Sequence, residues 1–302
     1  MIYTIKRCFF SLFILFVSAF SNNVVAQQDY KAELKSIGDS IFKGSTDSVR
    51  IASSNRTFEI LNELLKNPSS FNESFDSVKA ISSIYSPDKT LRFYQWALPV
   101  MESNSYRIFG FLQTYNQKKK TVEVYELKDA GADKYEAMDK KLLPGNCYTA
   151  VYYKIIETKS GKKKYYTLLG WRGNNLLTTI KVIDVLSFEN NKPVFGAKIF
   201  DASNYQLTYG DIHKKQRIIF EYNAQVVMTL RYEQKMKTIV YDHLSAAKAS
   251  LKGMEQFMGP DFTYDGFKWK KGKWIGKTNL EMKNNTSQTK KDFKLYKDGE
   301  QR

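Results

Sequence analysis

Few side chains in this sequence could do acid–base or nucleophilic chemistry. The two histidines are His213 and His243, and Cys147 is the cysteine that lies outside the N-terminal segment. A cysteine and a distant histidine can meet in space as a nucleophilic pair, but a lone cysteine is more often a small buried side chain. We therefore expect Cys147 to pack in a core at the start of a strand.

Aspartates supply the other candidates for catalysis. Asp242 directly precedes His243, and alternation along a strand places the two side chains on opposite faces, so Asp242 does not orient that imidazole. Two carboxylates at a suitable separation could act as acid and base in glycan hydrolysis, whereas Asx turns explain aspartates at strand ends without chemistry. The candidates for catalysis are Asp242, His243, Asp261 and Asp265.

The common sequence motifs of enzymes do not occur in this chain. It has no His-x-x-x-His, Cys-x-x-Cys, Walker loop, Gly-x-Ser-x-Gly or Gly-x-Gly-x-x-Gly pattern. These are the usual motifs of zinc sites, phosphate-binding loops, serine hydrolases and dinucleotide-binding proteins. The sequence therefore predicts neither a metal nor a cofactor, and it favours a binding or structural protein over an enzyme.

Aromatic and basic residues interleave in a hairpin that we expect to turn at Lys271-Gly272. Aromatic rings stack on sugars and lysines neutralise anions, so this composition suits an acidic glycan. Core packing is the competing explanation, because one face of such a hairpin must be buried. The candidate ligand-binding residues are Trp269, Trp274, Lys268, Lys270, Lys271 and Lys273.

The chain is strongly basic, with 47 Lys and Arg residues against 31 Asp and Glu and a net charge of +16. Such a balance suggests a polyanionic partner. In an exported protein this partner is an anionic envelope glycan or lipopolysaccharide rather than nucleic acid. Many lysines fall in expected turns, such as residues 118–120 and 162–164, where lysine also keeps strand edges solvated.

The N-terminus has the layout of a signal peptide. Lys6 and Arg7 precede an apolar run over residues 8–20, and Val24-Val25-Ala26 forms a small-residue cleavage motif. An apolar run this short does not span a bilayer comfortably, so we expect cleavage after residue 26, export, and no transmembrane span afterwards. A retained anchor is the alternative.

The elements that must position these residues differ between the two parts of the remaining chain. Apolar residues at helical spacing predict a helical segment over residues 27–80, with Thr46 or Asp47 as an N-cap. Short turns between apolar runs predict an antiparallel β domain over residues 81–282, followed by a polar, mobile tail over residues 283–302. The fold is thus mainly β, a hairpin-rich meander forming a sandwich, partial barrel or propeller-like structure.

The expected hairpins follow one another along the β domain. The cleanest alternation, at Val226, Met228, Leu230 and Tyr232, predicts a half-buried strand. We expect residues 225–232 to pair with residues 216–222 through a turn at Asn223-Ala224. Ser86-Pro87-Asp88-Lys89 resembles the turn of a propeller blade, but it does not recur at the spacing of about 40 to 50 residues that a propeller requires. The other expected strand pairs are 106–115 with 121–127, 149–158 with 164–171, 179–188 with 194–200, and 267–275 about its own turn.

Four motifs give the chain a resemblance to known sequences. They are Tyr165-Tyr166-Thr167-Leu168-Leu169-Gly170-Trp171, Ile218-Ile219-Phe220-Glu221-Tyr222, Tyr241-Asp242-His243-Leu244 and Gly259-Pro260-Asp261-Phe262-Thr263-Tyr264-Asp265-Gly266. With them, residues 80–280 resemble a group of secreted Bacteroidetes proteins to which no activity is assigned. The resemblance implies a Gram-negative envelope, and we expect the periplasm or cell envelope rather than the extracellular space.

In such bacteria, short Asp-Ser-aliphatic segments are typical O-glycosylation sites. Ser40, Ser48 and Ser77 lie in segments of this kind, although helix capping by Asp and Ser explains them equally well. The sequence thus predicts an exported binding or structural module of the envelope. The alternative is a carboxylate-dependent hydrolase acting on envelope glycans or peptides.

Overall fold

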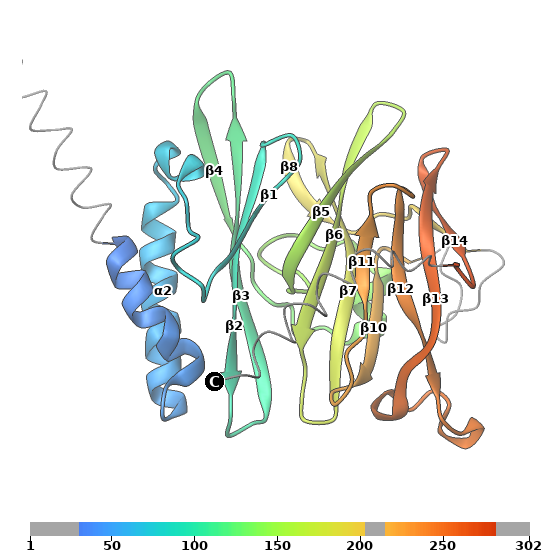
Figure 1. Ribbon diagram of the computed structural model, residues 1–302. Helices are drawn as coiled ribbons and strands as arrows, with labels where there is room; N and C mark the ends of the chain where they lie inside the picture. Colours follow the sequence, from blue (N-terminus) through green and yellow to red (C-terminus); the bar gives the residue numbers. More distant parts are fainter. Residues whose placement is uncertain (1–29, 203–214, 282–302) are drawn as a thin grey trace, which may run out of the picture.

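The chain folds into four stacked layers, one of helices and three of strands, as a computed structural model shows over residues 30–202 and 215–281 (Figure 1). Three hydrophobic clusters fill the spaces between neighbouring layers. The predicted mainly β fold with antiparallel sheets and a short N-terminal helical segment is confirmed. Of the three architectures that the sequence left open, stacked sheets are the one observed.

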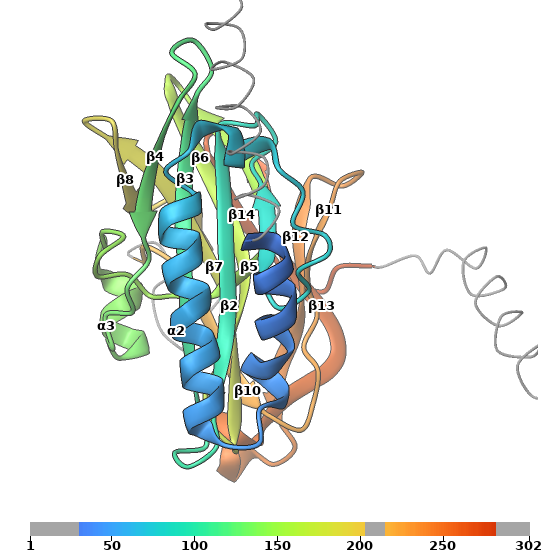
Figure 2. The same ribbon diagram turned by 90° about the vertical axis from the view of Figure 1, so that its left-hand side faces the viewer.

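The helical layer consists of residues 30–43, α2 (Asp47–Leu64) and the short 3-10 helix η1 (Pro68–Asn72). Thr46 is the N-cap of α2, because its Oγ1 accepts a hydrogen bond from the Val49 backbone N–H at 3.3 Å. The two longer helices lie side by side across the first sheet, as Figure 2 shows. Leu34 and Leu61 are buried on the face turned toward that sheet.

The first sheet is covered on both faces. Along β2, Trp96 packs toward the helices and donates to Ser54 Oγ at 2.8 Å, while Phe93 packs toward the second sheet. This is why every residue of β2 is buried and the strand shows no polar face. Its strands, in the order β1-β2-β3-β4, are Ser82–Tyr85, Leu91–Val100, Ser105–Asn116 and Thr121–Glu126.

The second sheet lies at the centre of the stack. Leu168 packs toward the first sheet and Leu169 toward the third, so strand alternation serves two cores. The helix α3 (Lys134–Asp139) precedes this sheet in the chain. Its strands are β5 (Val151–Ser160), β6 (Lys163–Gly173), β7 (Thr178–Glu189), β8 (Lys192–Phe195) and β10 (Ile218–Asn223), in the order β10-β7-β6-β5 with β8 paired to β7.

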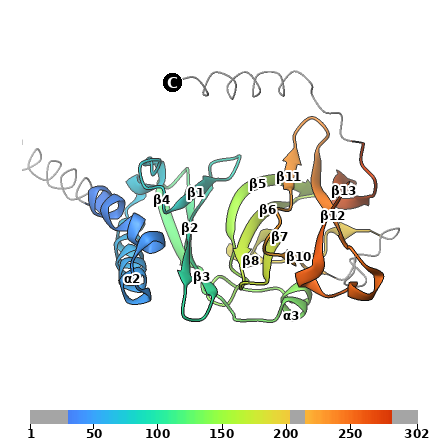
Figure 3. The same cartoon turned by 60° about the horizontal axis from the view of Figure 1, so that its bottom comes forward.

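The third sheet closes the stack, and Figure 3 shows the order of the layers from another side. Phe267 and Trp274 bury their rings between this sheet and the second. Strands β14 and β9 pair in parallel, whereas the other neighbouring strands of this sheet pair antiparallel. Its strands, in the order β11-β12-β13-β14-β9, are Leu230–Glu233, Thr238–Ala246, Met258–Lys270, Lys273–Lys277 and Phe200–Asp201, and the 3-10 helices η3 (Ala249–Leu251) and η4 (Glu255–Phe257) join β12 to β13.

The predicted hairpins β3–β4, β5–β6, β7–β8 and β13–β14 are present. The predicted pairing of residues 216–222 with 225–232 is wrong, because β10 belongs to the second sheet and β11 to the third. The side chain of Asn223 accepts from Gln225 N at 2.7 Å and ends β10 in an Asx turn, after which the chain crosses between layers. β11 begins only at Leu230, so the alternation from Val226 onward includes residues outside the strand.

The three serines of the Asp-Ser-aliphatic segments lie in or near the helical layer. Ser48 and Ser77 are exposed, and Ser40 is half-buried. Asp47, which precedes Ser48, accepts from the backbone N–H groups of Met101 and Glu102, so its carboxylate ties α2 to the turn after β2. The predicted signal peptide, the polar tail and His213 lie outside the described residues. Among the described residues, no helix combines the length and hydrophobicity needed to span a bilayer.

Candidate functional site

A groove of about 640 Å³ opens between the β1–β2 turn of the first sheet, β5 of the second and β11 of the third. All three segments reach the same end of the molecule, where the β1–β2, β5–β6 and β11–β12 turns lie (Figure 1). The groove is lined by Ile84, Tyr85, Ser86, Pro87, Lys89, Tyr153, Lys154, Ile155, Ile156, Glu157, Tyr232 and Gln234.

Tyrosine rings contributed by three different strands line this groove. The hydroxyl of Tyr153 donates to the Leu230 carbonyl at 2.8 Å, and that of Tyr85 donates to the Phe71 carbonyl at 2.5 Å. Tyr232 packs edge-on against the buried ring of Trp274. Each ring is therefore anchored by the fold and presents an aromatic surface that a ligand could contact.

Positive charge accompanies these rings. Lys89 and Lys154 are exposed along the groove, and Lys89 Nζ lies 4.1 Å from the centre of the Tyr85 ring. Glu157 also lines the groove, but it forms an ion pair with Lys164 at 3.3 Å. The groove is therefore suited to a ligand that has flat or ring-shaped groups and carries negative charge.

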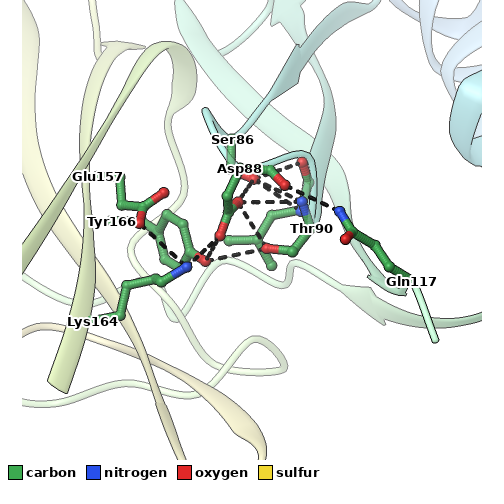
Figure 4. A network of polar contacts seen from close by, with 8 residues as sticks. Ser86, Asp88, Thr90, Gln117, Glu157, Lys164 and Tyr166 are labelled. Carbon is green, nitrogen blue, oxygen red and sulfur yellow. Dashed lines mark hydrogen bonds and ion pairs between the residues drawn. The ribbon is translucent and has the colours of Figure 1, made fainter. Parts of the chain in front are cut away.

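One wall of the groove is held by a network of polar contacts around Asp88, shown in Figure 4. Asp88 Oδ2 accepts from Lys164 Nζ at 2.6 Å and from the Tyr166 hydroxyl at 2.7 Å. Asp88 Oδ1 accepts from the hydroxyls of Ser86 at 2.6 Å and Thr90 at 2.8 Å. This Asp88 network joins the β1–β2 turn of the first sheet to β6 of the second.

Burial and the contacts of the Asp88 network shift the pKa values of Asp88 and Tyr166. Burial on its own would raise the pKa of Asp88, but the hydrogen bonds from Lys164, Ser86, Tyr166 and Thr90 outweigh it and hold that pKa well below its usual range. Burial raises the pKa of Tyr166 to about 12, so this hydroxyl stays protonated and donates. The carboxylate of Asp88 therefore remains charged over the physiological pH range.

The turn that carries Asp88 is shaped by its own sequence. Pro87 occupies a position where its fixed φ suits a turn, and Lys89 N donates to the Ser86 carbonyl at 3.0 Å. Lys89 adopts a φ of 54°, in the left-handed region that favours glycine. The turn thus places the Lys89 side chain at the groove in a backbone conformation that costs about 1 kcal/mol.

The structure brings three of the four catalytic candidates together and separates the fourth. His243 Nδ1 lies 2.7 Å from Asp265 Oδ2, and its Nε2 lies 3.9 Å from Asp261 Oδ2. Asp242 points to the other face of β12 and accepts from Thr229 N at 2.7 Å, as the alternation argument expects. His243 is half-buried, and the carboxylate of Asp265 is buried.

A break in strand pairing creates this second cluster. The register between β12 and β13 shifts opposite His243, and a bulge containing Asp261 and Phe262 bends the strand there. Phe262 has a φ of 69° and is 93% exposed, which is unusual for a bulky residue. Burial would raise the pKa of Asp261, but hydrogen bonds from Thr263 and the nearby His243 outweigh it and lower that pKa.

The C-terminal hairpin directs its aromatic residues inward. Trp274 is fully buried and its Nε1 donates to Thr167 Oγ1 at 2.9 Å. Trp269 packs edge-on against it, with ring centres 5.1 Å apart. The buried ring of Trp274 is therefore out of reach of a ligand in solvent. The four candidate lysines of the hairpin, Lys268, Lys270, Lys271 and Lys273, are exposed.

Cys147 lies in the core between the first and second sheets, as the sequence predicts. Burial raises the pKa of its thiol well above the usual range. His243 lies on the third sheet, so the two do not form a nucleophilic pair. Within residues 30–202 and 215–281, no group of three His, Cys, Asp or Glu residues is arranged to hold a metal ion.

The sequence does not identify the residues of the groove as a site. Tyr85, Tyr153 and Tyr232 follow the ordinary alternation of strands, and nothing in their spacing shows that three strands from three sheets converge. The Ser86-Pro87-Asp88-Lys89 turn is visible in the sequence, but its partners Lys164 and Tyr166 are not.

Comparison with protein-family models, with curated proteins and with solved structures found no match.

Proposed function

We propose that this protein is an exported, non-catalytic binding protein of the cell envelope whose groove takes an acidic glycan. The observation that carries the proposal is the convergence of Tyr85, Tyr153 and Tyr232 with Lys89 and Lys154 in one groove. Aromatic faces contact the apolar faces of sugar rings, and exposed lysines attract carboxylate or phosphate substituents. A volume of about 640 Å³ lies within the range of ligand-binding clefts.

The rigidity of the groove supports the same function. The Asp88 network ties the turn that carries Lys89 to β6, while the hydroxyl of Tyr153 ties β5 to β11. A groove whose walls are ordered before binding loses less conformational entropy when a ligand arrives. Preorganisation of this kind favours binding of a ligand that fits the groove.

Export is supported by the basic and apolar N-terminal segment and by the resemblance to secreted Bacteroidetes proteins. If residues 1–26 are removed, the mature chain begins at Gln27. Mass spectrometry of the N-terminal peptide from envelope fractions tests this directly. An intact Met1 on envelope protein would show a retained anchor instead.

Titration of an oligogalacturonate against the protein tests the glycan proposal. The groove variant Lys89→Ser with Lys154→Ser should bind about fivefold to tenfold more weakly, because each exposed charge contributes up to about 1 kcal/mol. A neutral glucan oligomer of equal length should bind more weakly to the wild type. Raising the salt concentration should narrow the difference between wild type and variant.

The hairpin supplies a matched control, since Lys268→Ser with Lys270→Ser removes the same charge from another surface. This control should bind the oligogalacturonate almost as the wild type does. If the hairpin variant binds weakly and the groove variant binds normally, the hairpin is the glycan surface. If neither variant differs from the wild type, the lysines of both surfaces serve only solubility.

A second function is favoured by one observation, the pairing of His243 with Asp265. A buried carboxylate on Nδ1 orients an imidazole and supports its action as a general base, with Asp261 as a nearby second carboxylate. This arrangement would suit hydrolysis of envelope glycans or peptides. Incubation with cell-wall and polysaccharide fractions tests it. If the wild type turns over such a fraction, and turnover is lost in Asp265→Asn or Asp261→Asn but kept in Asp39→Asn, the protein is a hydrolase and not a binding protein alone.

A further inference from the structure

The two ends of the strand stack differ in surface chemistry. At the groove end, the turns β3–β4, β5–β6, β11–β12 and β13–β14 are rich in lysine. Three loops at the opposite end of the strands (Figure 1) contain exposed apolar residues. These loops are residues 174–177 between β6 and β7, residues 224–229 between β10 and β11, and residues 247–257 between β12 and β13; together they are called the loop end.

The three loops of the loop end form one continuous surface. Ala224 N donates to the Leu177 carbonyl at 2.9 Å, which joins the first loop to the second. Asn223 Nδ2 donates to the Gln256 carbonyl at 2.8 Å, which joins the second loop to the third. The exposed apolar residues of the loop end are Leu176 at 68%, Leu177 at 63%, Val226 at 37%, Val227 at 86%, Met254 at 47% and Phe257 at 45%.

Charge at the loop end is sparse and positive. Its charged residues are Lys248, Lys252 and Glu255. Glu255 forms an ion pair with Lys134, which also pairs with Glu221, so the carboxylate of Glu255 is held within the fold while the two lysines of the loop end stay in excess. Lys248 and Lys252 are exposed beside Met254 and Phe257. The loop end therefore combines protruding apolar side chains with net positive charge.

We infer that the loop end docks on the surface of an anionic phospholipid bilayer. Separate loop tips bearing Leu, Val, Met and Phe suit insertion into the deformable boundary between headgroups and acyl chains. Neighbouring lysines gain about 1 kcal/mol each near an anionic leaflet, and their long stems keep the ammonium groups at headgroup level. This inference is independent of the glycan groove, which lies at the other end of the strands.

Co-sedimentation with vesicles tests the inference. Full-length mature protein should bind vesicles that contain phosphatidylglycerol more tightly than vesicles of phosphatidylcholine alone. The variant Leu177→Ser with Val227→Ser should bind the anionic vesicles roughly tenfold or more weakly, because buried apolar side chains of this size drive partition. Lys248→Ser with Lys252→Ser should weaken binding to anionic vesicles and leave binding to neutral vesicles unchanged.

Leu143→Ser with Met236→Ser is the matched control, because it removes exposed apolar side chains that lie elsewhere on the surface. This control should bind vesicles as the wild type does, and thermal melts should show all variants folded. If the wild-type protein binds neither type of vesicle, the inference is overturned. A wild-type dimer that Leu177→Ser with Val227→Ser converts to a monomer also overturns it, because the loop end would then bind a second copy of the chain. Oligogalacturonate binding by the Leu177→Ser, Val227→Ser variant should stay normal in every case.

Discussion

Asp88→Asn tests whether the Asp88 network holds the first and second sheets together. The substitution keeps the size of the side chain and removes its charge, and it places an amide N–H group where Lys164 Nζ or the Tyr166 hydroxyl now donates. The hydroxyls of Ser86 and Thr90 still face an oxygen acceptor if the amide nitrogen points toward β6. If the amide nitrogen points the other way, they lose that acceptor. An amide nitrogen turned toward β6 faces the Lys164 ammonium, and one turned toward the β1–β2 turn faces the Thr90 backbone N–H; both of these groups can only donate.

The magnitude follows from the contacts. Hydrogen bonds to a charged acceptor contribute about 1.5–3 kcal/mol each, but Lys164 keeps Glu157 as a partner and is partly exposed, so its share is that of a surface pair. We expect Asp88→Asn to lower the free energy of unfolding by about 2–3 kcal/mol at pH 7. Asp39→Asn, which removes an exposed carboxylate paired with Lys43, should change it by less than about 0.5 kcal/mol.

The difference should also depend on pH in a defined direction. The pKa of Asp88 in the folded protein lies below its value of about 3.9 in the unfolded chain. A carboxylate of this kind stabilises the fold fully above the unfolded-state pKa, and the contribution is lost as pH falls through the folded-state pKa. The gap between wild type and Asp88→Asn should therefore be constant above about pH 5 and shrink below about pH 4.

Urea unfolding followed by tryptophan fluorescence measures both effects. With a slope of about 2–3 kcal/mol per molar urea, the expected loss moves the midpoint by roughly 1 M. A shift no larger than that of Asp39→Asn would show that the network does not stabilise the fold. A gap that stays constant down to pH 3 would show that the charge of Asp88 plays no part in it.

Three further predictions concern other buried or strained residues. The buried thiol of Cys147 should resist iodoacetamide in native protein and react on unfolding, as peptide mass spectrometry can show; rapid labelling of native protein would contradict the burial-raised pKa. Asp184→Asn should lower the free energy of unfolding, measured by urea unfolding, by about 3–5 kcal/mol. The substitution leaves the fully buried guanidinium of Arg217, which lies 3.0 Å from Asp184, without its counter-charge. A loss below about 1 kcal/mol would show that backbone carbonyls satisfy Arg217. Phe262→Gly should raise stability by about 1 kcal/mol, because it relieves a left-handed backbone conformation at an exposed side chain, and a thermal melt that moves downward would show that the ring packs on the protein.

Much of the local structure could be predicted because turns and strands are encoded over a few residues. Glycine or asparagine in turns, proline at Pro87, and the N-cap at Thr46 act within their own segment. The same locality explains the failure at residues 216–232. Alternation identifies an extended segment, but it does not show whether the chain returns along the same sheet or crosses to another one.

The candidate sites depend on pairings that no local pattern contains. Asp88 meets Lys164 and Tyr166 across more than seventy residues of sequence, in contacts between two sheets. His243 meets Asp265 because β12 and β13 pair in a register that a bulge then shifts. A one-residue change of register turns every side chain of a strand to the other face, so sequence spacing within one strand could not place these groups.

The amino-acid sequence by itself determined the strand-and-turn content, the helical N-terminal segment, the burial of Cys147 and the separation of Asp242 from His243, because propensity, capping and alternation act between near neighbours. The tertiary structure alone decided that three sheets stack face to face, that Trp274 points into the core, and that tyrosines from three sheets meet in one groove. Those outcomes depend on which apolar faces cover one another. Burial of apolar area is non-directional, and so only the assembled layers select the partners.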